Sequence, residues 1–323
     1  MNALERHLQR FRRLALLTFF LLFAVVFAGA AVRILEAGMG CPDWPTCYGQ
    51  LIPPVYESQL PPDYRQRFAV GGKLAEPFDP LKTWAEYLNR LLAIVAGIGI
   101  LGMVAYSWVF LRTQTRLLFY TTALPILLLL QALLGWRVVA TYLAERMITL
   151  HMIFTLALTL CTLLAWAQTF PLEKASLRGE WRIYYFIGAF SWVALLIQIL
   201  SGASVRAAIN QAGWETAIYS PTFYFHRSFS WIVLGLWAYY HWRLYREPVR
   251  QPLARQWAIA TTLLLTLQVL LGAFLRYIAF TGVGKILHLW IALLAANTAF
   301  LSLYFFQYSV YGSSRKPVAQ PSL

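Results

Sequence analysis

The amino-acid sequence predicts an all-α integral membrane protein in which eight transmembrane helices form two repeated four-helix bundles. Hydrophobic residues make up 59% of the 323 residues and charged residues only 12%, a balance that is too apolar for a soluble domain. The apolar residues also form runs of about 20 residues, the length that a helix needs to cross a bilayer. There are eight such runs, at residues 14–33, 84–111, 117–140, 147–168, 184–206, 222–242, 256–277 and 285–308.

The first apolar run and the segment that follows it differ from the rest of the chain. Three arginines precede the first run, which therefore resembles a signal peptide, but no small-residue cleavage site follows it and we expect it to remain as a span. The long segment 34–83 follows the first run, whereas the other runs are joined by short segments. We therefore expect one large loop on the side of the membrane where the first helix ends.

The basic residues predict which side of the membrane each loop faces. If the N-terminus is cytoplasmic, the inner segments hold more than half of the 27 Lys and Arg residues but only four of the 13 Asp and Glu residues. Cytoplasmic loops carry such an excess, so both termini are predicted to be cytoplasmic. The formal net charge of +14 is therefore a topology signal. It does not indicate nucleic-acid binding, because the basic residues are divided among short loops.

The chain also repeats itself, which divides it into an N-terminal half (residues 1–170) and a C-terminal half (residues 171–323). Four crossings return the chain to the same side, so the two halves are expected to have parallel orientation. In the register of the repeat, Asn89 aligns with His226 and His151 aligns with His288. The matching segments are GAAVR 29–33 with GASVR 202–206, EYLNR 86–90 with FYFHR 223–227, and QALLG 131–135 with QVLLG 268–272.

Three histidines lie about one turn inside predicted helices: His151, His226 and His288. A lone histidine in a membrane usually makes a polar hydrogen bond between helices. Histidines at matched depth in two repeats instead indicate axial ligands of haem iron in the interior of a bundle. His226 and His288 form a bis-histidine pair, while the N-terminal half offers His151 and Asn89. With both termini inside, all four positions lie toward the outer side of the membrane.

The other two histidines are not expected to be ligands. His241 is fifteen residues beyond His226, so it lies about 22 Å deeper along a helix that rises 1.5 Å per residue. His7 lies in the basic N-terminal segment.

Arginines cluster at the outer ends of the predicted spans. Arg90 and Arg227 each follow a ligand position directly, and a guanidinium binds a carboxylate through two parallel hydrogen bonds. They are therefore candidates for binding the haem propionates, although marking the membrane edge is an equally good interpretation. Marking the membrane edge is the expected role of the remaining outer arginines, Arg33, Arg137, Arg206 and Arg276.

The outer segment 34–83 contains Cys41 and Cys47 within the sequence CPDWPTCYG. Both cysteines face the oxidising side of the predicted topology, where disulfides persist. The five intervening residues can close a small ring, and two cysteines alone make a poor metal site. A structural disulfide and a redox-active disulfide both remain open. Cys161 lies within a span and is expected to be an inert buried thiol.

The cysteine loop, the Glu86-x-x-Asn89-Arg90 element, the Gln-x-x-Leu-Gly repeats and the helix-opening histidines resemble the haem A synthase family over almost the whole chain. The resemblance implies oxidation of the C8 methyl group of haem O to a formyl group, giving haem A for terminal oxidases. It implies a b-type haem cofactor on His226 and His288. It also implies that the substrate haem O binds at His151 and the Asn89 position, beside the acid Glu86 and a Cys41–Cys47 pair.

At one position the chain departs from the family, which has Glu-x-x-His where this chain has Glu86-Tyr87-Leu88-Asn89. Asparagine is a poor iron ligand, so His151 alone would bind a haem in the N-terminal half and leave one face open, as oxygen chemistry requires. Glu86 and Asn89 share a helix face and together can hydrogen-bond a ligand on that side. The same change is also compatible with a weakened substrate site.

The expected function is therefore a membrane haem-modifying oxidase. Two alternatives remain, a non-catalytic membrane cytochrome b that transfers electrons and a haem-binding assembly or carrier protein. The expected location is the inner (cytoplasmic) membrane, with haem sites on the periplasmic side. The resemblance implies the haem O-producing farnesyltransferase and oxidase assembly factors as partners, and a homo-oligomer is compatible with the sequence.

Overall fold

The computed structural model of the protein describes residues 2–170, 172–174, 180–246 and 252–310. Each predicted apolar run lies on one long helix, and every helix begins earlier than the run. The long helices are α1 (Ala3–Ile34), α3 (Pro80–Phe110), α4 (Thr115–Ala140), α5 (Glu145–Ala167), α6 (Glu180–Ala212), α8 (Pro221–Arg246), α9 (Pro252–Tyr277) and α10 (Gly282–Phe306).

Polar capping residues explain why α1 and α3 begin before their apolar runs. The side chain of Asn2 accepts a hydrogen bond from the backbone N–H of Glu5, whose carboxylate accepts one from the backbone N–H of Asn2. The side chain of Asp79 caps α3 in the same way, and Pro80 occupies the first helical position, where no N–H is needed. These caps lie in polar flanks that a search for apolar runs does not detect.

Seven of the long helices in the described part of the chain are long and apolar enough to cross a membrane. The protein is therefore an all-helical integral membrane protein. The helix α8 is as long as α9 but is not among the seven, because polar and aromatic side chains lower the mean hydropathy of its residues. The eighth span thus stays a prediction. The predicted sidedness rests partly on residues that lie outside the described ones, namely Arg178, Arg250, Arg315 and Lys316.

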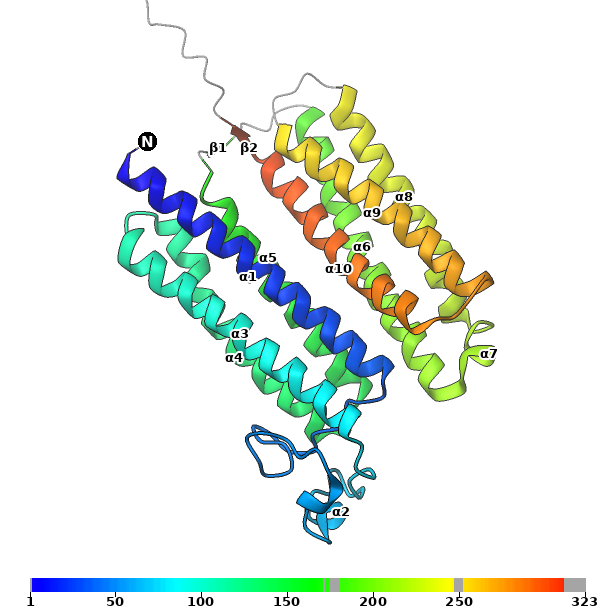
Figure 1. Cartoon of the computed structure of the whole chain (residues 1–323). Coiled ribbons are helices and arrows are strands. Elements are labelled where there is room, and N and C mark those ends of the chain that lie inside the picture. The colour runs from blue at the N-terminus through cyan, green and yellow to red at the C-terminus, as the bar shows by residue number, and fades with distance from the viewer. Residues whose placement is uncertain (1, 171, 175–179, 247–251, 311–323) are drawn as a thin grey trace, which may run out of the picture.

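The long helices are arranged in two groups of four (Figure 1). In the first group α1 packs on α3 and α5, and α4 packs on α3 and α5; in the second group α6 packs on α8 and α10, and α9 packs on α8 and α10. The groups meet where α10 contacts α1 and α5. Large apolar side chains remain exposed on the helices, among them Phe119, Ile126 and Leu129 of α4, as expected for surfaces that face lipid.

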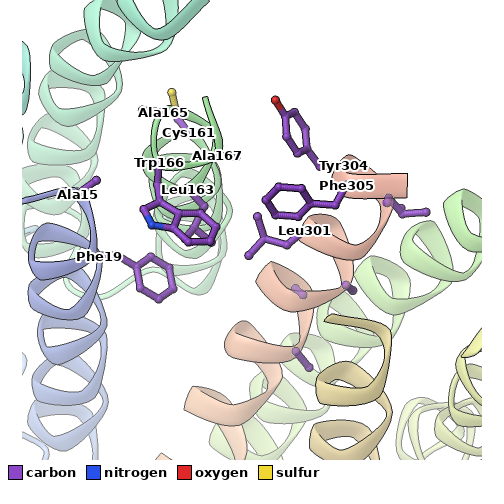
Figure 2. Packing of buried hydrophobic residues seen from close by; sticks show 14 of the residues in the cluster. Ala15, Phe19, Cys161, Leu163, Ala165, Trp166, Ala167, Leu301, Tyr304 and Phe305 are labelled. Carbon is purple, nitrogen blue, oxygen red and sulfur yellow. The ribbon is translucent and has the colours of Figure 1, made fainter. Parts of the chain in front are cut away.

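A single cluster of buried apolar residues joins the two groups of helices. Figure 2 shows Trp166 of α5 and Phe305 of α10 near each other in this cluster, and their rings lie edge to face with centroids 6.2 Å apart. Phe19 of α1 belongs to the same cluster. Rings in this geometry stabilise a contact beyond the area that they bury, so the two groups share one core.

Smaller features complete the described fold, one of which is the short helix α7 (Trp214–Ala217) between α6 and α8. A two-stranded antiparallel ribbon of β1 (Leu172–Lys174) and β2 (Tyr308–Val310) pairs the segment after α5 with the segment after α10. The prediction of an all-α chain did not include this ribbon, because segments of three residues carry no detectable pattern. The segment between α1 and α3 forms the predicted large loop, which contains the short helices η1 (Glu57–Gln59) and α2 (Tyr64–Arg67).

Candidate functional site

His226 of α8 and His288 of α10 face each other across the second group of helices. Their ring centroids lie 6.4 Å apart and their ring planes are inclined by 73°. An imidazole nitrogen bonds a metal ion at about 2.0–2.1 Å, so two rings that bind one ion from opposite sides have centroids roughly 6 Å apart. The observed separation fits two axial ligands of one haem iron. Among the described residues no group of three or more His, Cys, Asp or Glu side chains could hold a metal ion, but axial ligation of haem needs only two.

Residues of α6 hold the ring of His226 in place. The side-chain amide of Gln198 lies 3.1 Å from His226 Nδ1 and donates to the backbone carbonyl of His226 at 2.9 Å, while the Ser201 hydroxyl lies 2.9 Å from the same Nδ1. A partner on Nδ1 orients the ring and leaves Nε2 for a metal. Sequence reasoning missed Gln198 and Ser201, although their spacing from Gly202 placed all three on one face of a helix.

A glycine on a neighbouring helix lies against each of the four candidate ligand positions. A Cβ atom added to Gly202 would lie 3.0 Å from His226 Cε1, and one added to Gly272 would lie 3.3 Å from His288 Cε1. The same construction in the first group of helices gives 3.4 Å from Gly135 to His151 Cε1, and 3.7 Å from Gly29 to Asn89 Oδ1. A side chain at Gly202 or Gly272 would therefore crowd the imidazole beside it, whereas a Cβ atom at Gly135 or Gly29 would make an ordinary van der Waals contact.

His151 of α5 lies in a polar setting within the first group of helices. The Gln131 side-chain amide nitrogen lies 3.2 Å from His151 Nε2 and donates to the Thr155 hydroxyl. His151 Nδ1 is buried and has no hydrogen-bond partner among the described residues. In the second group the matching Gln268 donates to the backbone carbonyl of His288. Both histidines are therefore contacted by the glutamine that lies 20 residues earlier in the chain.

Glu86, at the start of α3, is 5% exposed and joins this helix to the cysteine loop. One carboxylate oxygen accepts the backbone N–H of Cys41 at 2.8 Å, and the other pairs with Arg90 at 2.5 Å. Arg90 also donates to the backbone carbonyls of Cys41, Asp43 and Thr46. The two terminal nitrogens of Arg90 are thus bonded to the loop and to Glu86. The guanidinium of Arg90 is therefore engaged within the protein, and its binding of a haem propionate stays a prediction.

The predicted disulfide between Cys41 and Cys47 is present, with both residues buried. Asp43 shapes the small ring, because its carboxylate accepts hydrogen bonds from the Thr46 hydroxyl and from the backbone N–H groups of Tyr48 and Gly49. These two N–H groups converge on one carboxylate because Tyr48 and Gly49 both adopt positive φ angles.

Tyr48 anchors the ring in the interior of the outer loop. It packs edge to face against Tyr64, Phe68 and Phe78. Burial, together with nearby negative groups, raises the pKa of Tyr48 to about 12, so its hydroxyl stays protonated at neutral pH. The cysteine ring is therefore held in place by an aromatic cluster in the outer loop.

The remaining candidates occupy simpler surroundings. Arg227 is exposed and its guanidinium lies over the Tyr224 ring, 5.2 Å from the centroid. Arg33 forms an ion pair with Glu145 of α5 at 3.2 Å, a contact that a residue marking the membrane edge does not require. Cys161 is a buried free thiol, as expected. His7 Nδ1 lies within hydrogen-bond distance of the Tyr106 hydroxyl.

Comparisons with known proteins identify the family of the chain. A family model described as COX15-CtaA, cytochrome oxidase assembly protein, matches residues 12–300. A protein named heme A synthase from Sinorhizobium medicae is 33% identical over 150 residues, which cover 44% of this chain and 40% of the relative. The heme A synthase of Shewanella oneidensis is 29% identical over 147 residues (46% and 42%), and that of Bartonella quintana 26% over 204 residues (57% and 54%).

The matched part of the chain thus spans about half the length, or less, of these relatives. The family model covers far more of the chain, including Glu86, Asn89 and all three histidines of the candidate sites. The chain therefore belongs to the COX15-CtaA family of cytochrome oxidase assembly proteins.

Proposed function

We propose that the protein is a membrane haem-modifying oxidase that converts the C8 methyl group of haem O to a formyl group in haem A biosynthesis. The observation that carries this proposal is the bonding of Glu86 to Cys41 and Arg90, which joins a buried acid at the start of α3 to a disulfide-closed loop. An electron-transfer cytochrome needs neither the acid nor the loop. The names of the relatives support the same reaction class.

Two haem positions follow from this proposal. The C-terminal half (171–323) would hold a b-type haem between His226 and His288, and the 6.4 Å between their rings supports this assignment. The N-terminal half (1–170) would hold the substrate haem O at His151, near Glu86. The equivalent packing of the helices and the four glycine contacts support two repeated halves. When bound, haem supplies an iron centre for redox chemistry; the side chains bind it, orient it and position protons.

The proposed location is the inner membrane with both termini cytoplasmic and the haem positions toward the periplasm. An oxidising environment on that side is consistent with the disulfide in the outer loop. The proposed partners are the farnesyltransferase that makes haem O and the assembly factors of the terminal oxidase.

One observation favours the alternative of a membrane cytochrome b. Asn89 stands where a second histidine would complete the N-terminal site. A chain that binds only the haem between His226 and His288 would transfer electrons without modifying haem.

Pigment extraction distinguishes these two functions. We expect haem A to appear in cells that supply haem O and express this protein, and to be absent with Glu86→Gln or His151→Ala. A His7→Ala variant is the control, because His7 lies outside both proposed sites and should leave the haem A peak unchanged. If cells that express the unsubstituted protein load haem normally into its C-terminal half but contain no haem A, the result would support the cytochrome b and contradict the oxidase.

A valine at Gly202 is expected to displace the His226 ring and abolish the low-spin haem signal. The reason is that the Cβ atom of a valine here would lie 3.0 Å from His226 Cε1, and its two methyl groups would add to this crowding. Gly235→Val is the matched control, since a Cβ atom at Gly235 in α8 meets nothing within 4 Å. Absorption spectra of the reduced proteins measure the effect, and equal haem content in both variants would show that Gly202 does not make room for the ligand.

A further inference from the structure

Asn89 stands at the position where the C-terminal half carries His226. The segment EYLNR 86–90 matches FYFHR 223–227 in the internal repeat. Each of the two side chains lies against a glycine of the neighbouring helix: a Cβ atom added to Gly29 would lie 3.7 Å from Asn89 Oδ1, and one added to Gly202 would lie 3.0 Å from His226 Cε1. These glycines are themselves matched in the repeat. The carboxamide of Asn89 therefore lies against α1, as the imidazole of His226 lies against α6.

The packing of the helices extends this equivalence to the opposite ligand position. Helix α3, which carries Asn89, packs on α1 and α4, as α8 packs on α6 and α9. Helix α5, which carries His151, packs on α4 and α1, as α10 packs on α9 and α6. His226 and His288 face each other across the second group of helices. From the same arrangement we infer that Asn89 faces His151 across the first group.

The chemistry of an amide differs from that of an imidazole at this position. Asparagine is shorter than histidine, and its neutral carboxamide is a weak metal ligand. At position 89 it therefore leaves open the space that a histidine would fill to reach the iron. The carboxamide offers two N–H donors and one oxygen acceptor. The Oδ1 atom of Asn89 is buried and has no hydrogen-bond partner in the described part of the chain. Buried polar atoms are rarely left unpaired, which points to a partner that joins the site when it is loaded.

The two charged groups nearest to Asn89 on α3, Glu86 and Arg90, are already engaged. Glu86, one turn before Asn89, uses one carboxylate oxygen for Cys41 and the other for Arg90. Arg90 uses both terminal nitrogens for Glu86 and the cysteine loop. Two side chains of this part of α3 keep a buried polar atom without a partner among the described residues, Asn89 and Thr83, and of these Asn89 is at the position that matches His226.

We propose that Asn89 makes a binding site for a small exogenous iron ligand, such as water or a diatomic molecule. This inference rests on the proposed haem position at His151. His151 supplies the protein ligand on one side of that iron, and the side facing Asn89 stays open. The Asn89 carboxamide then hydrogen-bonds whatever small ligand occupies the open position. The haem between His226 and His288 has both axial positions filled and does not take such a ligand.

Carbon monoxide and cyanide, added to the full-length protein in lipid nanodiscs loaded with haem O, are the probes. We expect two haem signals. One is low-spin and inert to both probes; the other is high-spin, binds both probes and is lost in His151→Ala. Asn89→His should convert the second signal to low-spin and abolish probe binding. Asn89→Ala should keep the position open but weaken cyanide binding about tenfold, as expected for loss of one hydrogen bond to a charged group. The low-spin signal of the C-terminal haem reports in each variant that the protein is folded.

The remaining outcomes separate a failure of this inference from a failure of the proposed function. A second haem that is already low-spin in the wild-type protein, or that stays unchanged in Asn89→His, means that Asn89 does not face the iron, while haem A formation can still be intact. A protein that binds haem only at His226 and His288 overturns both this inference and the proposed function. Probe binding that depends on Asn89 in a protein that makes no haem A supports the ligand site and contradicts the oxidase alone.

Discussion

Replacing either His226 or His288 with alanine is expected to abolish the low-spin haem signal of the purified protein. The two rings lie 6.4 Å apart, at the spacing that suits two axial ligands of one iron. Removing one imidazole leaves the iron with a single strong protein ligand, which favours the high-spin state and weakens retention of the haem. The sharp α-band of the reduced protein and the electron paramagnetic resonance spectrum of the oxidised protein measure this change.

The matched control for this prediction is His241→Ala. His241 is on the same helix α8, fifteen residues beyond His226, and is therefore far from the ligand position along the helix axis. This variant should keep the full low-spin spectrum. If the two ligand variants also keep it, His226 and His288 do not bind the iron.

Replacing Arg90 with methionine is expected to release the cysteine loop from α3. The substitution leaves the carboxylate of Glu86 buried and unpaired, and three backbone carbonyls of the loop lose their donor. Breaking a buried ion pair by removing one partner costs about 3–5 kcal/mol. Amide hydrogen exchange in residues 41–50 should therefore accelerate by more than about 100-fold, since each 1.4 kcal/mol is a factor of ten. The Cys41–Cys47 disulfide should also become accessible to a mild reductant.

Two further variants test the reason for this effect. Arg137→Met removes an exposed arginine at the end of α4 and should change neither exchange nor reduction. Arg90→Lys keeps the charge but not the fork of donors, so its loop should exchange at an intermediate rate. Unchanged exchange in Arg90→Met would mean that the disulfide and Asp43 hold the loop without Arg90.

The positions of the long helices could be predicted from the sequence because burial in lipid requires unbroken apolar runs. All eight runs lie on helices of the structure, and the capping residues Asn2 and Asp79 explain why two of these helices begin before their runs. The candidate ligands were also visible, since a histidine inside an apolar run is unusual wherever the chain folds. The disulfide followed from two cysteines that were close in sequence and placed on one side of the predicted membrane.

The partners of Arg90 were not predictable from the sequence. Its position beside Asn89 made it a candidate for binding a haem propionate or for marking the membrane edge. The structure joins Arg90 to Glu86 and to loop residues more than 40 positions earlier in the chain. The contacts of Gln198 and Ser201 with His226 likewise depend on how α6 is rotated against α8.

The sequence by itself determined the helical class, the repeat and the residue types available for binding haem, because these follow from local composition and spacing. Only the tertiary structure decided which of these residues meet. It brought His226 and His288 to 6.4 Å and placed a glycine beside each candidate ligand. The physical reason is that a side chain's partners across a bundle depend on the rotation and depth of two separate helices. An apolar run defines neither the rotation nor the depth of a helix, because hydrophobic residues occur on all faces of a helix in a membrane.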